Sequence, residues 1–174
     1  MSSSTFSSSR FVRLCAPILL VAGILAACSS TDDPATQADA VRVTDQWAKA
    51  AQSEMTAVFA TVTNGSDAAV RIVGGTTQSA ERVELHEMAE VDGTRVMRPI
   101  EGGLTVPAHG STVLRPGGDH IMLMGLRGPI RAGDEVRVTL NCTDGSTVVV
   151  VARARDFHGN QENYQPHASA PAHG

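Results

Sequence analysis

Between residues 41 and 155 the chain alternates short runs rich in Val, Thr and Ile with turns built from Gly, Asn, Asp and Pro. β-Branched residues favour strands, and turn residues at these intervals bound them. No stretch of ten or more residues shows the 3.6-residue apolar period of a helix. Strands are expected at residues 41–50, 55–64, 70–75, 82–88, 95–100, 111–114, 120–126, 135–142 and 147–154. Many short strands at this spacing predict an all-β Greek-key sandwich or barrel.

The N-terminal sequence has the pattern of an export signal. Two arginines precede an apolar run at residues 14–27, which is too short to read as a spanning helix. The run ends in "LAAC", which resembles the lipobox of bacterial lipoproteins, where the cysteine is lipidated and becomes the first mature residue. This pattern predicts a signal peptide at residues 1–27 and a lipid on Cys28. The alternative is ordinary secretory cleavage near Ala27, with Cys28 an incidental thiol.

Composition divides the rest of the chain into three parts. Residues 28–38 are polar and acidic and contain Pro34, as is typical of a flexible tether. Residues 39–155 hold the expected strands and form the folded domain. Residues 156–174, "DFHGNQENYQPHASAPAHG", are expected to be a disordered, histidine-containing tail.

The export signal and the lipid on Cys28 together predict the location of the protein. It is expected to be extracytoplasmic, or periplasmic, and lipid-anchored to the bacterial cell membrane.

Charge and cysteine content narrow the possible partners. Residues 1–27 hold two Arg and no acidic residue, so the net charge of −4 becomes −6 once they are removed. An acidic chain without a basic cluster is a poor binder of nucleic acid, and it would meet the membrane through its lipid. Cys15 leaves with the signal peptide and Cys28 carries the lipid. Cys142 then remains alone, without a disulfide partner or a Cys-x-x-Cys motif.

Imidazoles and thioethers gather in two of the expected strands. With the two-residue period of a strand, each strand presents a His-x-Met pair on one face, while Val83 and Leu85, or Ile121 and Leu123, occupy the other. A further methionine follows the "VDGT" turn, whose hairpin geometry can return it beside the first pair. The set comprises His86, Met88, Met97, His120, Met122 and Met124.

This set of side chains matches the ligand preference of Cu(I). Thioether sulfur is soft and a poor ligand for Mg²⁺ or Ca²⁺, whereas thioether with imidazole suits Cu(I). Zinc more usually recruits Cys, His or carboxylate and would leave the methionines unexplained. Each residue alone is more often a core filler or a structural histidine. Two His-x-Met pairs and a third methionine on strands that can pair are harder to explain by packing, and together they favour copper.

The motif also resembles the periplasmic copper chaperones of the PCu(A)C family. That family's pattern is a His, ten residues, a Met, about twenty-one residues, and then His-x-Met. Here ten residues separate His86 from Met97, and twenty-two separate Met97 from His120. The resemblance runs from about Val41 to Ala154 and includes "DQWAKA", "LRPGG" and "LRGPIRAGDEV".

The resemblance implies a cupredoxin-like β-sandwich that binds one Cu(I) and is not an enzyme. The positions that match the family's ligands are His86, Met97, His120 and Met122. Met88 and Met124 would be neighbouring thioethers at the rim of the site. The resemblance further implies transfer of copper to an acceptor in cytochrome c oxidase assembly, either an oxidase subunit or a Sco-type protein. Cys142 departs from the family, which more commonly has an aromatic or aliphatic residue there.

Other functions remain as alternatives. A blue-copper electron carrier needs a thiolate beside histidine, but no His follows Cys142 until His158. An enzyme would need a catalytic motif, and no nucleophile elbow, zinc-protease helix or phosphate loop occurs. A lipoprotein that only buffers copper, or that uses its methionines as a protein-contact patch, would look much the same.

The tail adds one more hypothesis. Imidazole with backbone amide suits Cu(II), so the tail could form a weak Cu(II) site; its candidate ligands are His158, His167 and His173. Some family members have His- and Met-containing extensions, but this tail contains no Met. The alternative is a solvated end without function.

Overall fold

The computed structural model describes residues 35–159. Within this range it contains one short helix and ten strands. This helix is neither long enough nor apolar enough to cross a membrane. The elements are α1 (Gln37–Ala40), β1 (Val41–Lys49), β2 (Met55–Asn64), β3 (Val70–Thr77), β4 (Ala80–Val91), β5 (Thr94–Pro99), β6 (Leu104–Val106), β7 (Ser111–Leu114), β8 (His120–Leu126), β9 (Glu135–Cys142) and β10 (Thr147–Arg155).

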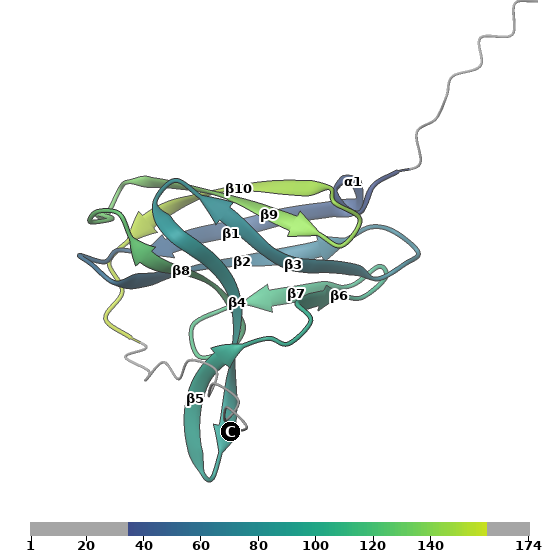
Figure 1. The fold of residues 1–174 in the computed structure, drawn as a ribbon. Coiled ribbons are helices and arrows are strands. Elements are labelled where there is room, and N and C mark those ends of the chain that lie inside the picture. Colours follow the sequence, from purple (N-terminus) through teal and green to yellow (C-terminus); the bar gives the residue numbers. More distant parts are fainter. Residues whose placement is uncertain (1–34, 160–174) are drawn as a thin grey trace, which may run out of the picture. The chain divides into compact units, whose positions relative to one another are not determined.

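Seven of the described strands close into a barrel, in the order β4-β8-β2-β1-β10-β9-β3 and back to β4 (Figure 1). Strands β1 and β10 pair in parallel, and the other neighbours in this ring are antiparallel. The ring closes where Gly75 of β3 pairs with Val83 of β4. A Cβ at position 75 would lie 2.6 Å from the Thr139 carbonyl oxygen, so only glycine fits between the two neighbours. The expected all-β barrel is confirmed.

The barrel interior is filled by the apolar face of each strand. Val58 and Val62 of β2, Ile121 and Leu123 of β8, and Val138 of β9 are fully buried there. Each such side chain stabilises the fold by roughly 1.5–3 kcal/mol relative to an exposed one. The methionines do not join this core. They form a separate cluster, described below.

Both ends of the described segment are attached to the barrel. Thr36 and Asp39 form a capping box that starts α1, and the Gln37 backbone N–H donates to Asp144 Oδ2 at 2.7 Å. After β10, Phe157 packs against Trp47 with ring centroids 5.4 Å apart. The expected tether and tail ranges therefore each include a few residues that contact the barrel.

The β4–β5 hairpin projects from the barrel wall (Figure 1). Its turn places Asp92 and Gly93 at φ 50° and 76°, the positive values that a two-residue hairpin of this type requires. The hairpin sets Met97 of β5 directly opposite Met88 of β4. Arg95 donates a hydrogen bond to the Gly117 carbonyl in the loop before β8, which fixes the hairpin against that loop.

Candidate metal centre

The candidate ligands lie on the outer face of the barrel wall. In β8, Ile121 and Leu123 point into the core, whereas Met122 and Met124 belong to the separate methionine cluster. In β4, Leu85 likewise packs in the core. The two-residue alternation expected from the sequence is therefore confirmed, and the pleat of two strands separates core residues from candidate ligands.

Strand pairing brings the two candidate histidines together. His86 of β4 is the direct partner of His120 of β8, and their ring centroids are 5.8 Å apart. Met122 follows His120 by two residues on the same face. Met97 reaches the pair from β5, where it lies opposite Met88. The side chains of His86, His120, Met97 and Met122 are only 0%, 4%, 5% and 5% exposed, so the structure gathers all four into one buried group.

The hydrogen bonds of His120 determine which ring nitrogen faces the group. Nδ1 lies 2.8 Å from the Gly118 carbonyl oxygen, so Nδ1 carries the proton and donates it. Nε2 lies 3.0 Å from the Met97 sulfur. Burial lowers the pKa of His120, and the nearby His86 adds to this, although the bond to Gly118 opposes it. The ring is therefore neutral at pH 7, and an Nε2 lone pair faces a sulfur lone pair.

Two facing lone pairs have no proton to share, but a soft cation can satisfy both. Imidazole Nε2 and thioether sulfur are donors that suit Cu(I). The Nδ1–H bond to a backbone carbonyl is also the usual way in which a protein orients a metal-binding histidine. The geometry at His120 therefore fits a copper ligand.

A carboxylate orients the second histidine. His86 Nε2 lies 2.9 Å from Glu84 Oε2, and the other oxygen of Glu84 accepts from Arg82 Nε at 3.1 Å. Burial raises the pKa of the Glu84 carboxyl, but the hydrogen bonds from His86 and Arg82 outweigh that effect and leave the pKa below its usual value. Glu84 is thus ionised at neutral pH and holds the His86 ring in place.

Two residues of the site, Met55 and Glu84, were not predicted from the sequence. Met55, at the start of β2, is the direct partner of Met124 and packs against the methionine cluster together with Met88. The two-residue alternation of the strand could have identified Glu84, because it places Glu84 on the same outer face of β4 as His86 and Met88. Met55 gave no local signal, since no histidine lies near it in the sequence.

The remaining predicted residues are placed as follows. His158 is exposed just after β10, whereas Cys28, His167 and His173 lie outside the described residues. Cys142 is buried in the barrel core opposite Ile72, and burial raises the pKa of its thiol. Its environment is that of a small apolar residue, away from the methionine cluster. Residues 35–159 contain no group of three or more His, Cys, Asp or Glu side chains that could hold a metal ion.

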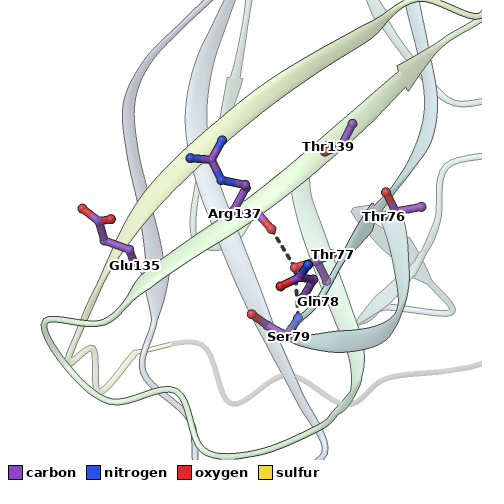
Figure 2. A pocket seen from close by; sticks show the side chains of 7 residues that line it. All are labelled: Thr76, Thr77, Gln78, Ser79, Glu135, Arg137 and Thr139. Atoms are coloured by element: carbon purple, nitrogen blue, oxygen red, sulfur yellow. Dashed lines mark hydrogen bonds between the residues drawn. The ribbon is translucent and has the colours of Figure 1, made fainter.

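A polar hollow of about 600 Å³ opens elsewhere on the barrel, between the end of β3 and β9. Figure 2 shows its wall, where Thr77 Oγ1 donates to the Arg137 carbonyl at 2.7 Å and the Ser79 backbone N–H donates to Thr77 Oγ1 at 3.2 Å. The Thr77 hydroxyl is therefore engaged with the backbone on both sides. None of the candidate copper ligands lines it.

Comparison with solved structures supports the fold. The copper-bound PCuAC domain from PmoF2 superposes with a TM-score of 0.56 at 18% identity, over 68% of this chain and 94% of that chain, which is a likeness of fold. The solution structure of CuI-DR1885 from Deinococcus radiodurans is 35% identical, with a TM-score of 0.51, over 70% of this chain and 83% of that chain.

Sequence comparison gives the family. The protein-family model described as "Putative lipoprotein LpqE-like" matches residues 41–154 of this chain. "Putative lipoprotein Lxx21020" of Leifsonia xyli subsp. xyli is 42% identical over 137 residues, which are 79% of this chain and 82% of the relative. The resemblance to PCu(A)C proteins is thereby confirmed, and the chain belongs to the LpqE-like lipoprotein family, which is of the PCuAC type.

Proposed function

We propose that the protein is an extracytoplasmic copper chaperone that binds one Cu(I) through His86, Met97, His120 and Met122. The observation that carries this proposal is the 3.0 Å contact between His120 Nε2 and the Met97 sulfur inside a buried group. The likeness to CuI-DR1885, at 35% identity, supports Cu(I) as the cargo.

The chemistry of the four ligands suits carriage rather than catalysis. Neutral thioethers and imidazoles hold a soft monovalent ion without thiolate, so the ligands of the ion can be exchanged one at a time. Burial of all four side chains keeps water from the ion. The PCuAC-type family supports a protein that carries copper rather than one that performs a reaction on it.

The place of action follows from the N-terminus. We propose that residues 1–27 are removed as a signal peptide, that Cys28 carries a lipid, and that residues 28–38 tether the domain of residues 39–155 to the cell membrane. The lipoprotein family supports this location. The acceptor would be a membrane-bound cuproprotein, either a cytochrome c oxidase subunit or a Sco-type protein.

The ligand set can be tested by competition with a Cu(I) chelator under anaerobic conditions. His120→Ala and Met122→Leu should each weaken Cu(I) binding strongly while the far-ultraviolet circular dichroism stays that of the wild type. The matched control is His109→Ala, because His109 is an exposed histidine whose ring contacts Asp67 Oδ1 at 2.6 Å and none of the proposed ligands. Wild-type affinity in both ligand variants would overturn the assignment.

We further propose that the tail holds one weak Cu(II) site built from His158, His167 and His173. Imidazole and backbone amide suit Cu(II), whereas the thioethers of the barrel suit Cu(I). A triple alanine variant at these positions keeps the contact of Phe157 with Trp47. It should lose one weak Cu(II) equivalent and keep its Cu(I) affinity; identical Cu(II) isotherms would refute the tail site.

A further inference from the structure

The proposed ligands raise a question of access. All four are at most 5% exposed, so a Cu(I) ion held by them is out of reach of a partner's side chains. An ion can leave only by exchanging ligands along the wall. Additional soft donors next to the group would provide such a route, and the described residues contain three more thioethers: Met55, Met88 and Met124.

Two of these thioethers form a pair of their own. Met55 of β2 and Met124 of β8 are direct cross-strand partners, which places their Cβ atoms about 5 Å apart. Met122 lies on the same face of β8, about 6.6 Å along the strand from Met124. The partner of Met122 on β2 is Ala57, whose small side chain leaves room beside the three sulfurs.

Exposure changes along this row in the direction that transfer requires. Met122 and Met124 are buried, whereas Met55, at the start of β2, is half-buried and reaches solvent. The row therefore connects the buried imidazoles to the surface through thioethers alone. At the opposite end of the group, Met88 is also half-buried, but it offers only a single additional sulfur, across from Met97, and has no second thioether beyond the proposed ligands to pair with.

We propose that Met55 and Met124, sharing Met122, form a second Cu(I) site at which the ion stops between the buried ligands and a partner. This inference rests on the proposed function, because it concerns the route of the same ion. Three thioethers without imidazole make a weaker soft-metal site than two imidazoles with two thioethers, as a transit position requires. Arg82, the partner of Met124 on β4, is paired with Glu84 at 3.1 Å, which offsets its positive charge.

Packing alone would not require methionine at these positions. The cluster lies on the outer face and is separate from the barrel core, so its side chains do not complete the interior. Leucine has a similar volume and would cover the wall equally well. The Met55→Leu/Met124→Leu double variant therefore removes both sulfurs while it keeps the shape of the face.

The test is an anaerobic Cu(I) titration of the full-length chain with ¹³C-labelled methionine methyl groups. In the wild type, the first equivalent should shift the Met97 and Met122 methyl signals, and a weaker second equivalent should shift those of Met55 and Met124. The double variant should keep the first equivalent and lose the second, and its transfer of Cu(I) to a chelator should slow. Met88→Leu is the matched control and should keep both equivalents.

The outcomes separate the two proposals. If the first equivalent binds normally but the double variant retains the second equivalent and the wild-type transfer rate, the transit site is refuted and the chaperone function stands. If Cu(I) never shifts Met97, the proposed ligand set fails. In that case, a shift of Met122 that accompanies those of Met55 and Met124, and that is absent from the double variant, would still establish the thioether site by itself.

Discussion

Replacement of Glu84 by glutamine should weaken Cu(I) binding although Glu84 is not a proposed ligand. Its carboxylate accepts hydrogen bonds from His86 Nε2 at 2.9 Å and from Arg82 Nε at 3.1 Å, and so fixes the ring of a proposed ligand. A glutamine keeps the size of the side chain but has one oxygen in place of two, and its amide group would face one of the two donors. The orientation of the imidazole is then no longer enforced.

The expected magnitude follows from the kind of contact that is lost. Loss of a hydrogen-bond partner that orients a metal-binding histidine typically lowers metal affinity by about 10- to 100-fold. This corresponds to about 1.4–2.8 kcal/mol of binding free energy. The barrel itself should remain folded, because Glu84 is on the outer face and contributes nothing to the apolar core.

The assay is chelator competition at pH 7 on the wild type, Glu84→Gln and the matched variant Glu87→Gln. Glu87 lies on the same strand and carries the same charge, but it pairs with Arg98 at 2.9 Å on the surface. Exposed ion pairs contribute only about 0–1 kcal/mol, so Glu87→Gln reports the effect of charge alone. Equal affinities in the two variants would show that Glu84 does not position His86 for copper.

Three further predictions concern acid, the anchor and the fold. Burial lowers the pKa of His120 below the ordinary 6.5, so the unfolded chain binds the proton more strongly than the folded chain does. The contribution of His120 to the free energy of unfolding should therefore be complete above about pH 6.5 and be lost as the pH falls below that value. Denaturant titrations of the copper-free protein at several pH values measure this change. Cys28→Ser should abolish incorporation of labelled lipid and release the protein from the membrane fraction, and an unlabelled wild type would exclude the anchor. Gly103→Ala should destabilise the fold by roughly 1–3 kcal/mol in denaturant titrations, because φ there is +88° and a Cβ would lie 2.3 Å from the Ile72 carbonyl oxygen; unchanged stability would contradict this packing argument.

The strands could be predicted because local chemistry determines them. Runs of β-branched residues between Gly, Asn and Asp turns gave β2, β7, β8 and β9 with the bounds that the structure has. The two shortest elements could not be predicted from the sequence, for physical reasons. Strand β6 has three residues, too few for an alternating pattern, and α1 is a single turn whose start depends on the Thr36–Asp39 capping box.

The sequence could predict which residues of the candidate site share a face within one strand, but not which strands pair to bring them together. The two-residue period placed each histidine with its methionine, because neighbours on one face need no knowledge of the partner strand. The pairing of His86 with His120 depends on the register between β4 and β8, and the pairing of Met55 with Met124 depends on β2 lying beside β8. Such contacts join residues far apart in sequence, so no local pattern reveals them.

The pleat of β8 has a further consequence for how the protein can change. Ile121 and Leu123 are wholly buried in the barrel core, while His120 and Met122 alternate with them on the outer face. A substitution that removes the sulfur of Met122 leaves the core contacts of Leu123 in place. The proposed copper ligands and the core residues are therefore different side chains of the same seven-residue strand. This separation lets ligand variants be read as tests of copper binding, since loss of a ligand does not entail loss of the barrel that displays it.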